Sequence, residues 1–135
     1  MLFRSATFHG KYASFDRAKS YPKPAQQDGI PIHVGGHSGA AARRAGRLGD
    51  GWFPIGLRED GFATRYDEVR SAATGEGRDP DAIEVTYSGS RKPDVVKRYA
   101  DLGVSRWVVA AWADDLESCK RLLGELSDTL IVPLS

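Results

Sequence analysis

From Pro31 onward the chain alternates between short apolar runs and longer amphipathic stretches. Short runs rich in β-branched and aromatic side chains are typical of strands, and they lie at residues 32–34, 52–55, 83–88 and 104–111. Stretches with helical spacing follow them at residues 38–48, 60–73, 93–102 and about 115–126. The pattern therefore predicts four strand–helix units between residues 31 and 135.

Residues suited to helix ends mark the predicted helices. Ser38 stands where the first helix needs an N-cap, and Asp114 or Asp115 does so for the last. Pro93 opens the third helix at its first turn, where a missing N–H costs nothing, and Gly103 closes it.

Strands that alternate with helices imply an α/β fold with a parallel sheet and right-handed crossovers. A complete TIM (β/α)8 barrel takes about 250 residues, so four units are the size of a half barrel. The alternation of strands and helices alone also fits an open doubly wound sheet. The sequence pattern does not decide between the two architectures.

The first 30 residues follow neither period. Prolines at positions 22 and 24 favour extended backbone and exclude a regular helix there. We expect an N-terminal arm over residues 1–30 with a short hairpin around His9-Gly10-Lys11, and a half barrel over residues 31–135 in a single domain. The aromatic residues expected to pack the arm are Phe3, Phe8, Tyr12 and Phe15.

Composition excludes several function classes. The net charge is +1, which gives no electrostatic reason to expect nucleic acid or a membrane surface as a partner. No apolar run approaches the roughly 20 residues that span a bilayer, and the start lacks a signal-peptide core, so a cytoplasmic protein is expected. A single cysteine, Cys119, excludes an internal disulfide, and the three histidines lack metal-ligand spacing, so no metal is expected.

The candidate chemistry lies where the first strand of the predicted half barrel ends. Gly35 and Gly36 follow that strand, and a helix begins directly after them with Ser38 at its cap position. Glycine allows close approach of the backbone to a ligand, and the free N–H groups of a first helical turn attract an anion such as phosphate. The alternative is a tight turn with an ordinary N-cap. The run is neither the dinucleotide fingerprint nor a Walker loop.

Other polar residues have a structural and a functional interpretation. His33 is expected to be a hydrogen-bonded core histidine, with a position facing a ligand in the barrel as the alternative, whereas His37 is the better candidate for ligand contact. A basic helix face of Arg43, Arg44 and Arg47 is expected to be solvated, or to pair Arg44 with Asp50, and the minority alternative is that it anchors an anionic coenzyme tail. We expect ligand contact from Ser88-Gly89-Ser90 only as a minority alternative, and packing roles for Trp52, Trp107 and Trp112.

The whole chain resembles the bacterial-luciferase-like monooxygenases and their deazaflavin-dependent relatives. The matching segments are Thr7–Tyr12 with Phe15-Asp16, Pro22-Lys23-Pro24 with Gln26, Pro31–Gly36, Arg44-Ala45, and Gly49–Trp52. The resemblance implies a (β/α)8 barrel that binds FMN or the deazaflavin coenzyme F420. It also implies that the coenzyme phosphate lies against the backbone of Gly35, Gly36 and His37, the Ser38 hydroxyl, and the next strand's end at Ile55-Gly56.

In that family four strands precede the Thr-Phe-His-Gly segment and carry much of the contact to the coenzyme ring. One expectation is therefore an oxidoreductase completed by dimerisation or by a separate N-terminal half chain. The other is a non-catalytic remnant that binds a phosphate-bearing ligand or has a structural role. Because four units leave two sheet edges and one face open, a homodimer is the expected oligomer.

Overall fold

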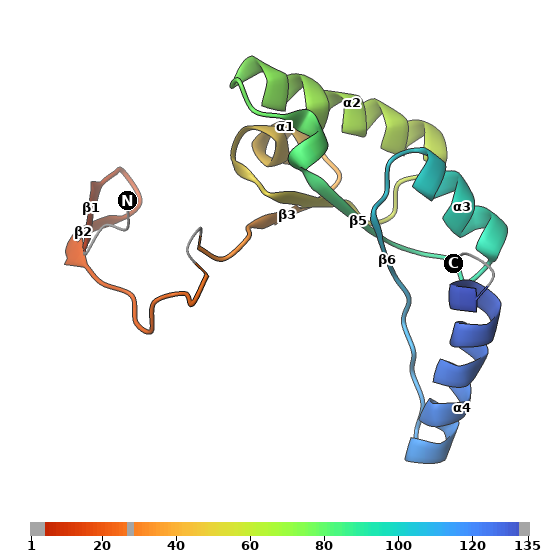
Figure 1. Cartoon of the computed structure of the whole chain (residues 1–135). Helices are drawn as coiled ribbons and strands as arrows, with labels where there is room; N and C mark the ends of the chain where they lie inside the picture. The colour runs from red at the N-terminus through yellow and green to blue at the C-terminus, as the bar shows by residue number, and fades with distance from the viewer. Residues whose placement is uncertain (1–4, 27–28, 133–135) are drawn as a thin grey trace. The chain divides into compact units, whose positions relative to one another are not determined.

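The computed structural model describes residues 5–26 and 29–132. The chain falls into two compact units, residues 1–30 and residues 31–135. Figure 1 shows the elements of each unit in chain order. No helix among the described residues is long and apolar enough to cross a membrane.

The N-terminal unit contains an antiparallel hairpin of β1 (Ala6–His9) and β2 (Ser14–Ala18). Gly10 N–H donates to the Ala13 carbonyl at 2.8 Å and closes the turn, so the predicted hairpin is confirmed. Phe8 and Phe15 pack with ring centroids 6.0 Å apart. The expectation for Tyr12 is wrong, since it is 91% exposed at the hairpin tip. Phe3, also expected to pack, lies outside the described residues.

The second unit contains the four predicted strand–helix repeats (Figure 1). Its strands are β3 (His33–Gly35), β4 (Gly51–Phe53), β5 (Glu84–Ser88) and β6 (Arg106–Val108). Its helices are α1 (Gly39–Leu48), α2 (Glu59–Gly75), α3 (Pro93–Asp101) and α4 (Leu116–Leu126), with a 3₁₀ turn η1 (Pro80–Ala82) before β5 and a π-helical turn η2 (Ser127–Ile131) after α4.

All strand pairs of the second unit are parallel, and the strand order is β3-β4-β5-β6. A doubly wound sheet reverses its strand order at a switch point, whereas a barrel adds strands in chain order. The observed order is the barrel order, which selects the half barrel from the two architectures that the sequence allowed. β6 is shorter than the predicted strand at 104–111, because its pairing with β5 ends at Val108 opposite Ser88, the last residue of β5.

The predicted helix caps are present. The Ser38 hydroxyl accepts from Ala41 N–H at 3.2 Å, and the Asp115 carboxylate accepts from Ser118 N–H at 2.8 Å. Pro93 occupies the first turn of α3, and Gly103 follows that helix with a φ of +102°. Local capping chemistry therefore sets the helix ends.

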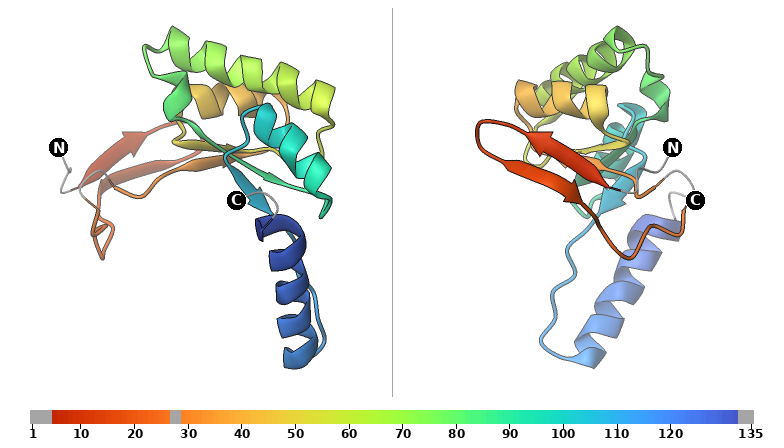
Figure 2. Two further views of the ribbon diagram at one scale, coloured as in Figure 1. Left: turned by 45° about the vertical axis from the view of Figure 1, so that its right-hand side comes forward. Right: turned by 90° about the vertical axis from the view of Figure 1, so that its left-hand side faces the viewer.

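The core lies between the sheet and the helices α1 and α2, which cover the same side of it (Figure 2). Trp52 from β4 is fully buried, and its ring stacks on Phe62 of α2 at 5.6 Å. α1 approaches α2 so closely that a Cβ on Gly46 would overlap the Val69 carbonyl oxygen. Successive strand residues point to opposite faces, so residues that alternate with the buried ones, such as Glu84, occupy the other face of the sheet.

Candidate functional site

The Gly-Gly junction at the end of β3 is held by two hydrogen bonds. Gly36 has a φ of +107°, a conformation that favours glycine, and a Cβ there would lie 3.2 Å from the Ala41 Cβ. Its N–H donates to the Phe53 carbonyl at 3.2 Å, and its carbonyl accepts from Trp52 Nε1 at 3.0 Å. The turn is therefore tied to β4 before any ligand is present.

These bonds determine which donors remain for an anion. Gly36 N–H is already engaged, so it is not a free donor. In contrast, the N–H groups of His37, Ser38, Gly39 and Ala40 have no hydrogen-bond partner within residues 5–26 and 29–132. The Ser38 hydroxyl accepts a bond from the helix and keeps its own hydrogen to donate. The junction therefore offers a row of donors at a helix N-terminus.

The end of the next strand contributes open space beside this row. Ile55 forms a parallel bridge with Ser88 and is 58% exposed. Gly56 has a φ of +80°. A Cβ built on Gly56 or on Gly35 would meet no heavy atom within 4 Å. Both glycines thus leave the backbone accessible at the carboxyl ends of neighbouring strands.

No acidic residue lies in the first turn of α1, which leaves the positive end of its dipole uncompensated. Two arginines farther along α1 pair with α2 and its C-cap: Arg43 lies 3.4 Å from Glu68, and Arg47 pairs with the C-cap residue Glu76 at 2.8 Å. The expected Arg44–Asp50 pair is absent, because Asp50 instead accepts from Ile32 N–H at 2.8 Å at the start of β3. Arg44 lies on the exposed helix face that was the other expectation.

Together these residues fit a phosphate group. A dianion requires several N–H donors, a positive local potential and room for close approach. The loop from His37 to Ala40 supplies the donors, the start of α1 supplies the potential, and Gly35 and Gly56 supply the room.

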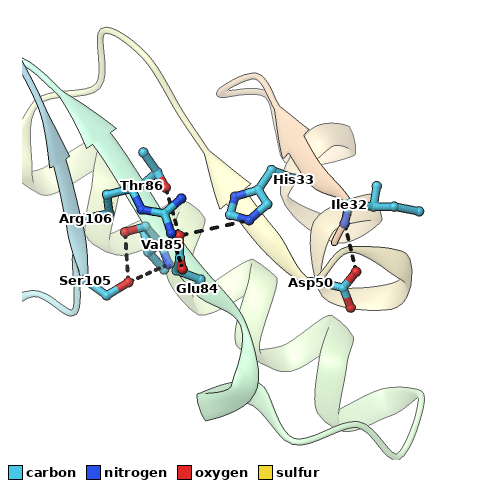
Figure 3. Close-up of polar contacts among 8 residues, drawn as sticks. All are labelled: Ile32, His33, Asp50, Glu84, Val85, Thr86, Ser105 and Arg106. Atoms are coloured by element: carbon cyan, nitrogen blue, oxygen red, sulfur yellow. Dashed lines mark hydrogen bonds and ion pairs between the residues drawn. The ribbon is translucent and has the colours of Figure 1, made fainter. Parts of the chain in front are cut away.

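A second polar cluster lies at the opposite end of the strands (Figure 3). Glu84 accepts from Arg106 at 2.8 Å and from the Thr86 hydroxyl at 3.3 Å, and His33 Nε2 lies 4.0 Å from it. The His33 ring covers Gly51, the neighbour to which it is paired in β4. His33, Glu84 and Arg106 begin their strands, at the end where a barrel's polar residues serve stability.

His33 therefore differs from the core histidine that the sequence favoured. Its side chain is 30% exposed and lies on the sheet face opposite Trp52 and the helices. Because strand residues alternate between faces, its neighbour Val34 takes the buried position. The His33 side chain thus lies on the sheet face that the alternative interpretation expected. It does so at the start of β3, however, whereas Gly35 and the Gly-Gly junction lie at the end of that strand.

Aromatic hydroxyl and indole groups hold the other loops at the carboxyl edge. The Tyr87 and Tyr99 hydroxyls both donate to the Leu57 carbonyl in the loop after β4. Burial raises the pKa of the Tyr99 phenol, so this donor stays protonated. Trp107 Nε1 donates to the Ser90 carbonyl at 3.1 Å and anchors the loop after β5.

One of the main structural contacts has no local signal in the sequence. The Arg78 guanidinium donates to the carbonyls of Gly46 and Gly49, both at 2.6 Å, and so caps the C-terminus of α1. Conversely, the expected packing of Trp112 is wrong, because that side chain is 86% exposed. Cys119 is half-buried. Among the described residues no group of three His, Cys, Asp or Glu side chains could hold a metal ion.

Comparison with known sequences places these features in a family. The model of the luciferase-like monooxygenase family matches residues 1–92. An uncharacterised protein of Mycobacterium tuberculosis is 37% identical over 103 residues, which are 76% of this chain and 35% of the relative. The F420-dependent glucose-6-phosphate dehydrogenase of Nakamurella multipartita is 46% identical over 46 residues, 34% of this chain and 13% of the relative. The chain thus spans about a third or less of the length of these curated relatives.

Solved structures have the same fold at low sequence identity. The F420-dependent tetrahydromethanopterin reductase of Methanopyrus kandleri has a TM-score of 0.73 at 13% identity, covering 96% of this chain and 58% of that one. An F420-dependent secondary alcohol dehydrogenase has a TM-score of 0.74 at 14% identity, covering 94% and 56%. Both neighbours are TIM-barrel enzymes, of which this chain spans little more than half. The chain belongs to the luciferase-like monooxygenase family.

Proposed function

We propose that this chain supplies the phosphate-binding part of a flavin- or deazaflavin-dependent oxidoreductase. The observation that carries the proposal is the row of unpartnered N–H groups from His37 to Ala40 beside the open positions of Gly35 and Gly56. Membership of the luciferase-like monooxygenase family supports it. Names of similar proteins favour coenzyme F420 as the first candidate, with FMN as the second.

In this proposal each residue has a defined role. Gly36 makes the turn that directs the following N–H groups outward, and Trp52 fixes that turn through the Gly36 carbonyl. The N–H groups of the first turn of α1 and the Ser38 hydroxyl bind the phosphate oxygens. When bound, such a coenzyme supplies the redox chemistry, and the chain's contribution is to hold and orient it.

We propose further that the open face of the sheet is covered by four more strands, either from a second copy of this chain or from a separate N-terminal half chain. The support is the extent of the chain, which covers 58% and 56% of the two structural neighbours. Exposed strand edges and an uncovered sheet face favour association. Light scattering of the purified chain should give a dimer mass. A monomer that gains affinity only on addition of an N-terminal half chain would point to the split enzyme.

The coenzyme proposal is tested by titrating the chain with F420 and with FMN, read by coenzyme fluorescence. The informative variant is Gly35→Val, because a Cβ at this position would meet no heavy atom within 4 Å, and the fold should therefore stay intact. If the phosphate lies against this loop, the variant should bind at least about tenfold more weakly, through loss of close approach.

Gly124→Val is the matched control, since a Cβ on Gly124 of α4 also meets no atom within 4 Å and lies away from the junction. It should bind both coenzymes as the unmodified chain does. Absence of coenzyme binding up to millimolar concentration would contradict the proposed function. The remaining interpretation would then be a non-catalytic remnant with a structural role.

A further inference from the structure

An exposed tryptophan lines a polar pocket beyond the carboxyl ends of β5 and β6. The segment that follows β6 runs alongside α4 (Figures 1 and 2), and the pocket lies where this segment, the loop after β5 and α4 meet. Its volume is about 380 Å³. Trp112 and the two arginines Arg91 and Arg121 contribute to its lining.

Three side chains of this pocket, Trp112, Arg91 and Arg121, remain available for contact with a ligand. Trp112 is 86% exposed, although an indole of this size gains stability when it is buried. Within the described part of the chain, Arg121 makes no hydrogen bond or ion pair. Arg91 donates one N–H to the Ala110 carbonyl, which ties the loop after β5 to the segment after β6 and leaves its other N–H groups available.

We infer that Trp112, Arg91 and Arg121 form a second ligand subsite, which takes a planar aromatic anion. The indole supplies a stacking surface, and the planar guanidinium groups bind a carboxylate or phosphate in bidentate geometry. The pocket lies beyond the same edge of the sheet as the Gly-Gly junction, two and three strands along from β3.

The carboxylates in the pocket limit the long-range attraction. Asp114 and Glu125 also line it, and their charges balance those of Arg91 and Arg121. Affinity therefore depends on direct stacking and on short-range contact with Arg121, and only weakly on ionic strength. Asp114 and Glu125 remain as acceptors for a hydroxyl or amino group of the ligand.

Identification of this ligand as the substrate rests on the proposed function, whereas its binding does not. The test is a titration of the full chain with 2-naphthoate, followed by NMR of the indole N–H signals. Those of Trp52 and Trp107 are hydrogen-bonded to carbonyls, so the Trp112 signal is distinct and is assigned with Trp112→Phe. The comparison probes are 2-naphthylmethanol, which is neutral, and 2-naphthyltrimethylammonium, which is cationic.

We expect naphthoate to shift the Trp112 signal, with an affinity about fivefold lower in Trp112→Ala and in Arg121→Gln. Lys120→Gln is the matched control, because it removes the same charge from α4 outside the pocket and should change nothing. Equal or tighter binding of the neutral or cationic probe would overturn the inference. So would naphthoate binding that both pocket variants leave unchanged, or no shift in either the free or the coenzyme-loaded chain.

The two proposals fail separately. Naphthoate binding at Trp112 without any coenzyme binding would leave the subsite standing and contradict the proposed function. Coenzyme binding that is weakened by Gly35→Val, with no naphthoate response at Trp112, would support the proposed function and overturn the subsite.

Discussion

The indole of Trp52 donates its N–H to the carbonyl of Gly36 at 3.0 Å, so a fully buried core residue fixes the turn that precedes α1. The same ring stacks on Phe62 at 5.6 Å. One side chain thus joins the packing between the sheet and α2 to the conformation of the candidate phosphate loop. Changes in this part of the core should therefore reach the loop.

Trp52→Phe should weaken both stability and phosphate binding. It keeps an aromatic ring but removes the hydrogen bond and part of the packed volume, at a cost of about 2 kcal/mol in the free energy of unfolding. Urea denaturation measures the first effect and coenzyme titration the second. Trp107→Phe is the control, because it removes the corresponding bond to Ser90 and should leave coenzyme affinity unchanged. Equal affinity in the two variants would contradict the role of Trp52.

Gly46→Ala should disrupt the contact between α1 and α2. The added Cβ would overlap the Val69 carbonyl oxygen and crowd the Ala72 Cβ, so the helices must separate. We expect a loss of about 1–3 kcal/mol in the free energy of unfolding. Gly124→Ala in α4 adds the same methyl group in open space and should be neutral or stabilising by up to about 1 kcal/mol. Thermal unfolding of both variants distinguishes crowding from helix propensity.

Arg78→Ala should destabilise the end of α1. The guanidinium satisfies the carbonyls of Gly46 and Gly49, and its removal leaves these half-enclosed acceptors without a charged donor. The expected cost is about 2 kcal/mol in the free energy of unfolding. Arg78→Lys should recover only part of it, because an ammonium group lacks the planar fork that reaches both acceptors. Full recovery by lysine, measured by urea denaturation, would show that charge alone matters.

The start of α4 should depend on pH through Asp115. Hydrogen bonds from the Ser118 backbone N–H and then from its hydroxyl lower the pKa of this carboxyl below its ordinary value of 3.8. The pKa of Asp115 is lower in the folded chain than in the unfolded chain. The cap therefore contributes its full stabilisation of the fold above the unfolded-state pKa, and this stabilisation is lost as the pH falls through the folded-state pKa. NMR should show the Ser118 N–H losing its capped shift only at a pH below the ordinary carboxyl value of 3.8. In Asp115→Asn this acid transition should disappear.

The order of the elements was predictable because its signals are local. Ser38, Pro93 and Asp115 begin helices through their own side chains or rings, and the structure has each in that role. The sheet order then selected a half barrel from the two architectures compatible with the period.

The remaining features depend on residues that are distant in sequence. Gly36 N–H bonds to Phe53 only because β3 and β4 pair in one register, and Arg78 reaches α1 across 29 and 32 residues. The exposure of Trp112 depends on which parts of the chain pack against the segment after β6, and no local sequence pattern specifies that packing. For the same reason the sequence favoured a core role for His33, whose side chain is 30% exposed in the structure.

The strand order has a consequence for how this chain acquires its structure. Each strand pairs only with the strand before or after it in the sequence, so no pairing must wait for a distant segment to arrive. The sheet can therefore assemble progressively from the β3–α1–β4–α2 region, where Trp52, Phe62 and Val69 are fully buried. Assembly of this kind resembles that of a repeat protein, in which new units are added at an end without rebuilding the units already formed.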